Sequence, residues 1–204
     1  MSTITYRQRA GKVFRDWYPS VLLILLLLVA RSTLADHYHV PSGSMENALV
    51  PGDHVLVNNA AYGLRVPFTK QVFALQNDPQ RGEVVVLDSP DSDVRLIKRV
   101  TAIGGDHVVL RRGRLVINGE PLHLPGNPNV EWFGDRSVEL NLDAGGGPDI
   151  HGMTIPEDHV LLLGDDRGAS HDGRFFGTGP VEDLYGRAIG VFWRSSEGPT
   201  WRAL

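Results

Sequence analysis

Three short stretches of this 204-residue chain combine residue types that could do chemistry. The first is the sequence VPSGSM at residues 40–45, in which Ser42 and Ser44 surround a glycine. A tight, exposed turn of this kind can present a serine hydroxyl together with free backbone N–H groups, as a nucleophile and its oxyanion hole require. The alternative is a plain turn that joins two elements, because turn preferences alone also explain these residues.

The second stretch is the sequence LIKRV at residues 96–100, inside an apolar run that predicts a strand. Adjacent side chains on a strand point to opposite faces, so either Lys98 or Arg99 should point into the protein or a groove. If Lys98 faces the groove, we expect Arg99 to face solvent. Burial lowers the pKa of a lysine, and a neutral lysine can then serve as a general base, which an arginine cannot. The alternative is a lysine on an edge strand with its charge in water, because lysines are rarely buried.

The third stretch is the sequence GDDRGASHDGR at residues 164–174, directly after an apolar run. Its acids alternate with arginines, and such residues can fix a loop through bidentate ion pairs. The alternative is a solvated acidic loop. A calcium loop of the EF-hand type is disfavoured, because the ligand spacing and the terminal Glu are missing.

Composition and spacing exclude or disfavour several other sites. The chain has no Cys, so it has no disulfide, thiol nucleophile, iron–sulfur site or zinc finger. His37 and His39 lie close together, but no H-E-x-x-H motif or third ligand accompanies them, and we predict no metal and no cofactor. A Ser-His-Asp triad lacks its G-x-S-x-G elbow, and no Ser-x-x-Lys motif occurs.

The elements that must position these residues are mainly strands. After residue 35, apolar runs of three to six residues alternate with Gly, Pro, Asn and Asp, and the chain holds 23 Gly and 13 Pro. This pattern predicts a mostly β domain of barrel or sandwich type, with a hairpin turn at Asn118-Gly119. Residues 118–155 are the least regular, and we expect a loop-rich insertion there.

The N-terminal region predicts a membrane anchor. Residues 21–30 are all apolar, Trp17 and Tyr18 precede them, and Arg31 follows, so we expect a span over residues 17–35. Residues 1–16 carry a net charge of +3 and should stay in the cytoplasm, whereas residues 36–204 carry −8 and should form a domain outside. The alternatives are a cleaved secretory signal and a buried core helix. Because residues 36–204 carry a net charge of −8, this domain is a poor candidate for binding nucleic acid.

Taken in chain order, these pieces resemble bacterial type I signal peptidase, the membrane-anchored leader peptidase. The stretches that carry the resemblance are residues 17–32, 40–45, 81–86, 97–106, 164–174 and 186–188. Each stretch is weakly specific alone, and their order behind an N-terminal anchor makes the combination specific.

The resemblance implies a serine protease with a Ser-Lys dyad on a mostly β fold. Ser44 would be the nucleophile and Lys98 the general base. The Ser42 hydroxyl and the Ser44 N–H would form the oxyanion hole, and Ser170 would orient Lys98 by a hydrogen bond. Supporting residues would be the ion pair of Asp172 and Arg174, with Asp165 and Arg167 nearby.

The resemblance also implies the substrates and the location. The partners would be exported preproteins, cleaved after small residues at positions −1 and −3 of their signal peptides, and membrane lipid. The enzyme would cross the inner membrane once and work on the periplasmic face. Its shallow substrate pockets would be formed by Tyr38, Val40, Met45, Val86, Leu96 and Ile97.

The chain departs from the family pattern at two places. Asn47-Ala48 stand where Pro-Thr is usual. In the third stretch, Asp166, Gly168, Ala169 and Gly173 replace the usual Asn, Asp, Asn and Ser. Because Gly168 and Ala169 lack hydrogen-bonding side chains, we expect a looser loop, and restoring Asp and Asn there should raise turnover or stability.

Two other classes of protein remain as alternatives. The related self-cleaving repressors use the same chemistry on a similar fold, but they would need a DNA-binding helical domain in place of the anchor. A non-catalytic anchored β domain would tolerate the loss of Ser44 or Lys98, and both are present.

Overall fold

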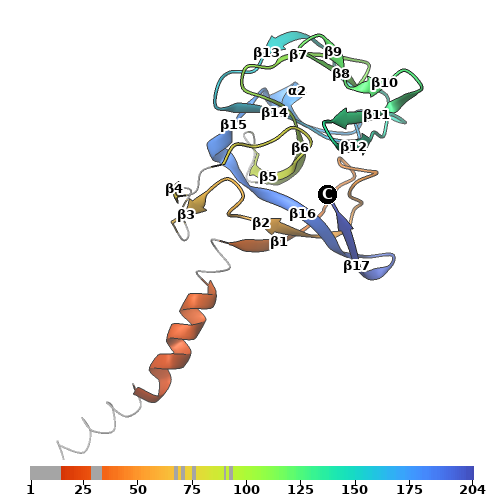
Figure 1. Cartoon of the computed structure of the whole chain (residues 1–204). Coiled ribbons are helices and arrows are strands. Elements are labelled where there is room, and N and C mark those ends of the chain that lie inside the picture. The colour runs from red at the N-terminus through yellow and green to blue at the C-terminus, as the bar shows by residue number, and fades with distance from the viewer. Residues whose placement is uncertain are drawn as a thin grey trace, which may run out of the picture.

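The computed structural model describes residues 15–28, 34–66, 69, 72–74, 77–89, 91 and 94–204. A helix over residues 15–28 projects from a β-rich domain (Figure 1). Within the described residues, no helix has both the length and the apolar character needed to cross a membrane. The span expected at residues 17–35 includes residues 29–33, which lie outside the described residues, and its last residue, Ala35, begins a strand.

The largest sheet has eight strands, and every pairing within it is antiparallel. The order is β1-β2-β16-β5-β6-β14-β15, and β17 pairs with β16. Its strands are β1 (Ala35–His39), β2 (His54–Asn58), β5 (Val84–Asp88), β6 (Arg95–Ile103), β14 (His159–Leu163), β15 (Gly179–Pro180), β16 (Leu184–Arg194) and β17 (Gly198–Ala203). In the described residues this sheet has two ends, β1 and β15, and closes no barrel.

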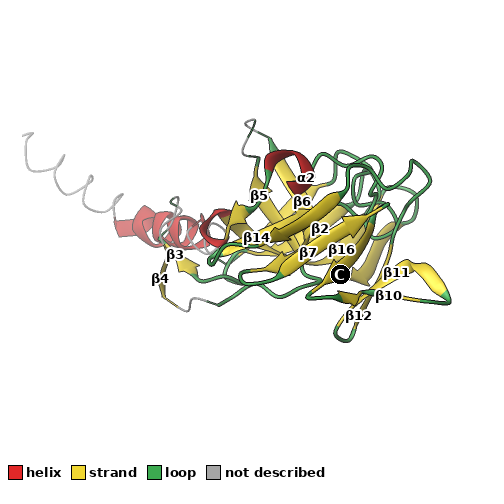
Figure 2. Cartoon of the chain, turned by 90° about the horizontal axis from the view of Figure 1, so that it is seen from above, coloured by secondary structure: helices red, strands yellow, loops and turns green. Residues whose placement is uncertain are grey.

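Three smaller sheets complete the domain. The first, ordered β13-β7-β8-β9, contains β7 (His107–Arg111), β8 (Arg114–Ile117), β9 (Glu120–Pro121) and β13 (Ile150–Thr154). The second contains β10 (His123–Leu124), β11 (Asn127–Phe133) and β12 (Arg136–Glu139), and the third pairs β3 (Leu64–Arg65) with β4 (Val72–Ala74). A short helix, α2 (Gly173–Phe176), packs near β14 (Figure 2). A 3₁₀ turn, η1 (Val181–Asp183), precedes β16.

The mostly β prediction is confirmed, and so is the turn at Asn118-Gly119. Both residues have positive φ, 53° and 85°, as a two-residue hairpin turn between β8 and β9 requires. The prediction of a loop-rich insertion at residues 118–155 is wrong, because this stretch holds β9 to β13. The inward-facing positions of β11 include Glu131, which is buried. This charged residue interrupts the alternation of apolar and polar residues from which a strand is predicted.

The core fixes the serine turn and β6, the two segments that hold Ser44 and Lys98. β5 reads VVVLD and is buried on both faces, so it forms the centre of the sheet beside β6. One core cluster contains Val84 and Val86 of β5 together with Val40 and Met45, which flank the serine turn on either side. Because both flanks of the turn are buried, residues 42–44 are held at a fixed place against β6.

Candidate active site

Ser44 and Lys98 are 54 positions apart in the chain, and the fold brings their reactive atoms together. Lys98 Nζ lies 2.7 Å from Ser44 Oγ, within hydrogen-bond distance. Lys98 projects from the first half of β6, and only 2% of the residue is exposed. A hydroxyl and an amine in this contact are the two parts that a nucleophile and its base require.

The electrostatic setting of Lys98 favours the neutral amine. Desolvation by burial is the largest influence and lowers the pKa of Lys98 to about 8. The charges of Asp172 and Asp165 oppose that decrease in pKa, while the Arg174 guanidinium adds to it. A pKa near 8 leaves an appreciable fraction of the amine free to accept a proton in mildly alkaline solution.

The serine turn supplies further polar groups. Ser42 Oγ lies 3.4 Å from Ser44 Oγ, and within the described residues the Ser44 N–H has no hydrogen-bond partner. The turn closes through hydrogen bonds from the Glu46 N–H to the Gly43 carbonyl and from the Leu49 N–H to the Met45 carbonyl. A free N–H and a hydroxyl beside the nucleophile are suitable donors for a developing oxyanion.

The expected exposure of Arg99 is wrong. Only 5% of Arg99 is exposed, because both faces of β6 are covered at this point. Its guanidinium donates to both carboxylate oxygens of Asp165, at 2.8 and 2.6 Å, and to the Gly82 carbonyl at 2.7 Å. Lys98 and Arg99 do point to opposite faces, but the second face is an ion-pair site and not solvent.

The ion pair expected between Asp172 and Arg174 is present. Arg174 Nε donates to Asp172 Oδ1 at 2.8 Å, and the Gly164 N–H donates to Asp172 Oδ2 at 3.0 Å. Asp172 also caps α2 by accepting from the Arg174 N–H. Burial raises the pKa of Asp172, but the hydrogen bonds and charge of Arg174 outweigh burial and hold it below its usual value.

Ser170 is buried at the site without the expected contact. The hydrogen bonds of the described residues include none between Ser170 and Lys98. Its hydroxyl lies beside Asp172 and contributes to the lowered pKa of that carboxyl. It also lies against Gly164, where an added Cβ would come within 2.3 Å of Ser170 Oγ and 2.4 Å of the Ser44 carbonyl oxygen. Only glycine therefore fits at position 164.

Arg167 pairs with a residue that sequence reasoning missed. Its Nη2 lies 2.6 Å from Oε2 of Glu131 on β11, and both side chains are fully buried. Arg167 also donates to the Gly164 carbonyl, and Glu131 accepts from the Leu115 N–H. The arginine thus ties the loop of residues 164–172 to β11 and β8. No local pattern identifies Glu131, which lies 36 residues away in the stretch expected to be a loop.

Asn141 is a second missed residue. Its N–H donates to the Asp165 carbonyl, and its own carbonyl accepts from the Arg167 N–H. Its side-chain amide donates to Glu46, two positions after Ser44, at 3.2 Å. Asn141 therefore links the loop of residues 164–172 and the serine turn in one hydrogen-bonded unit.

The expectation of a loose loop at Gly168 is wrong. A Cβ at this position would lie 2.4 Å from the carbonyl carbon of Ala144. Real Cβ atoms do not approach this closely, so glycine is needed here for tight packing. Ala169 is exposed and borders the pocket that Ser44 and Lys98 also line.

A pocket of about 340 Å³ adjoins Ser44 and Lys98. Four of the six residues expected in the substrate pockets line it: Val40, Met45, Leu96 and Ile97. Tyr38 and Val86 do not line it, although both pack in the core cluster beneath it. The other lining residues are Pro41, Ser42, Ser44, Val94, Arg95, Lys98, Ala169 and His171.

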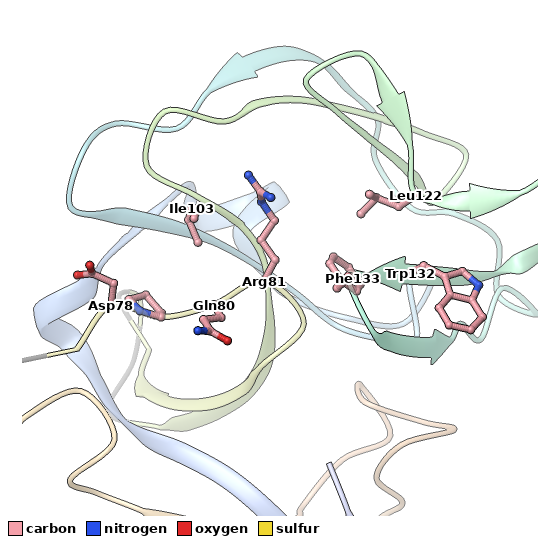
Figure 3. Close-up of a pocket in the computed structure, with 9 residues that line it drawn as sticks. Asp78, Gln80, Arg81, Ile103, Leu122, Trp132 and Phe133 are labelled. Carbon is pink, nitrogen blue, oxygen red and sulfur yellow. The ribbon is translucent and has the colours of Figure 1, made fainter.

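A larger pocket of about 430 Å³ lies elsewhere and holds none of the residues expected to be catalytic, supporting or substrate-binding (Figure 3). It is lined by Asp78, Pro79, Gln80, Arg81, Ile103, Leu122, Trp132, Phe133 and Gly134. Its arginine, Arg81, already pairs with Asp106. Over the described part of the chain, no group of three or more His, Asp or Glu residues is arranged to hold a metal ion.

Comparisons with known proteins agree on one family. The family model described as signal peptidase, peptidase S26, matches residues 14–193. Signal peptidase I of Pseudomonas fluorescens is 34% identical over 91% of this chain and 72% of its own length. Signal peptidase I of Pseudomonas aeruginosa is 32% identical with the same coverage, and the probable signal peptidase I-2 of Synechocystis is 30% identical over 85% of this chain and 70% of its own length.

Proposed function

Because the chain belongs to the signal peptidase, peptidase S26, family of hydrolases, we propose that it removes N-terminal signal peptides from exported preproteins with a Ser-Lys dyad. Ser44 is the nucleophile and Lys98 the general base. The observation that carries this assignment is the 2.7 Å contact between Ser44 Oγ and a buried Lys98 Nζ.

In the acylation step, neutral Lys98 takes the proton of the Ser44 hydroxyl as Oγ attacks the carbonyl carbon of substrate residue −1. Lys98 then gives this proton to the leaving amine of residue +1, so the scissile C–N bond breaks and an ester to Ser44 remains. A buried, neutral lysine is a recorded substitute for the histidine of a triad.

In the deacylation step, Lys98 acts as base a second time. It takes a proton from a water molecule that attacks the ester carbonyl, and it returns a proton to Ser44 Oγ as the signal peptide leaves. The Ser44 N–H and the Ser42 hydroxyl stabilise the oxyanion in both steps, because they lie beside the nucleophile and need no rearrangement.

The proposed specificity is for small residues at −1 and −3. The pocket beside the dyad has apolar walls from Val40, Met45, Leu96 and Ile97, which suit an alanine methyl group. Tyr38 and Val86 support these walls from the core cluster. Asp172 and Arg174 fix the loop beside the dyad, with Ser170 buried next to Asp172, and Asp165 and Arg167 tie this loop to β6 and β11.

We also propose that residues 17–35 anchor the enzyme in the inner membrane. The apolar side chains of residues 21–28 are all exposed on the described helix, as are Trp17 and Tyr18. Such a surface is stable when lipid covers it. The N-terminus would then be cytoplasmic, and the domain of residues 36–204 would meet inserted signal peptides at the periplasmic face.

The test uses the purified full-length chain in detergent with a preprotein substrate. Mass spectrometry of the products should show one cut, after small residues at −1 and −3, and Ser44→Ala should abolish it while remaining folded. Cleavage by folded Ser44→Ala, or no cleavage by the intact chain, would contradict the proposal.

A further inference from the structure

Arg95 is the first residue of β6 and lines the pocket beside the dyad. Its guanidinium bridges two strands at the border of this pocket. It donates through Nη1 to the Tyr38 hydroxyl on β1, and its Cζ lies 4.2 Å from the ring centroid of Tyr185 on β16. The guanidinium is therefore held in place by aromatic rings, a favourable setting for a cation.

The charge of Arg95 is only partly neutralised. Its Nε donates to Asp88 Oδ1 at 3.2 Å, and about two fifths of each side chain is exposed, 42% for Arg95 and 43% for Asp88. Within the described residues, Nη2 of Arg95 makes no hydrogen bond. This nitrogen has two N–H donors available, and a planar guanidinium binds carboxylates well.

The position of Arg95 along β6 indicates which part of a substrate it meets. Leu96 and Ile97, proposed to bind residues −1 and −3, stand between Arg95 and Lys98. A strand rises about 3.3 Å per residue, so Arg95 lies roughly 10 Å from Lys98 along it. An extended substrate that fills the apolar pocket would reach Arg95 just upstream of residue −3.

We propose that Arg95 is a specificity-determining residue that reads the charge of the substrate side chain at position −4 or −5. It favours an acidic side chain there and disfavours a basic one. This inference rests on the proposed function, because it assumes that a preprotein lies across the dyad in this direction.

The experiment measures kcat/KM for peptides with Ala at −1 and −3 that carry Glu, Gln or Lys at −4 or −5. The full-length chain in neutral detergent should prefer Glu over Lys about 5- to 10-fold at one of these positions, since an exposed ion pair gives a few-fold effect and a like charge costs as much again. The preference should shrink in high salt. Arg95→Gln should remove it, and Arg95→Glu should reverse it.

Two further variants keep the test decisive. Asp88→Asn leaves Arg95 in place and removes its neutralising carboxylate, so the preference for Glu should increase. Arg202→Gln removes an exposed arginine that pairs with Glu197, away from the pocket, and should leave the preference unchanged. Equal cleavage of the Glu, Gln and Lys peptides, or a preference that survives Arg95→Gln, overturns this inference alone. Failure to cleave even the Gln peptides or a preprotein overturns the proposed function and this inference with it.

Discussion

Arg167 and Glu131 form an ion pair in which neither side chain is exposed, with Nη2 and Oε2 2.6 Å apart. The pair joins the loop of residues 164–172 to β11. Arg167 also donates to the carbonyl of Gly164, which packs so closely against Ser44 and Ser170 that an added Cβ would clash with both. This loop is thus fixed by an arginine whose charge is neutralised by a glutamate on a strand distant in sequence.

Glu131→Leu should destabilise the protein strongly. It leaves the Arg167 guanidinium buried without its carboxylate, and breaking a buried pair from one side costs about 3–5 kcal/mol. Urea unfolding of the full-length chain in detergent measures the effect. The matched control is Glu197→Leu, which breaks the exposed pair with Arg202 and should cost less than about 1 kcal/mol. If the two variants lower the free energy of unfolding equally, burial of the Arg167–Glu131 pair does not increase its contribution to stability.

Activity should rise with pH as Lys98 loses its proton. Burial lowers the pKa of Lys98 to about 8, so the acidic limb of kcat/KM should have its midpoint near pH 8. Lys98→Arg keeps a cation of similar length that does not deprotonate, and it should be folded and inactive from pH 7 to 9. Near-normal cleavage by this variant would remove Lys98 from the mechanism, and His171, which borders the pocket, would be tested next.

Gly168→Asp, which restores the residue usual in the family, should destabilise this chain. Its Cβ would meet the backbone of Ala144 at 2.4 Å, and such overpacking costs about 1–3 kcal/mol. Ala169→Asn changes an exposed neighbour and should leave the melting temperature nearly unchanged. Greater stability in Gly168→Asp would mean that residue 144 moves aside easily.

Asn47→Pro, the other return to the family residue, should lower both stability and kcat/KM. Asn47 has a φ of 78°, whereas proline is fixed near −65°, so the turn after Ser44 must rearrange. We expect a loss of about 3 kcal/mol or more in thermal or urea unfolding. Asn47→Gly accepts positive φ and is the matched control, with activity close to that of the parent chain. If the proline variant matches the glycine variant, the turn tolerates either backbone conformation.

Protease added to spheroplasts should digest the domain of residues 36–204 and spare the N-terminal segment. The net charge of +3 on residues 1–16 should keep them inside, because positive residues resist translocation. Antibodies against each end of the chain follow the fragments on a gel. Protection of the C-terminal domain in intact spheroplasts, with digestion after lysis, would reverse the proposed orientation.

The sequence by itself determined the parts that depend on local pattern. Short apolar runs with turn residues between them indicated a mostly β domain, and Asn118-Gly119 marked a hairpin because both positions need positive φ. The turn with Ser44 and the lysine in an apolar strand were also recognisable, since each is a short run of residue types. Their order along the chain was enough to indicate the family.

The tertiary structure alone decided what surrounds these residues. Sequence spacing says nothing about the partner of a charged residue 36 or more positions away, so the pairs of Arg99 with Asp165 and of Arg167 with Glu131 were not foreseen. A buried charge also breaks the apolar alternation that marks a strand, which is why β11 was expected to be a loop. Close backbone packing has no signature in residue type, because glycine serves a flexible turn and a crowded contact equally well. We therefore expected Gly168 to loosen the loop, whereas its lack of a side chain lets the loop pack closely against Ala144.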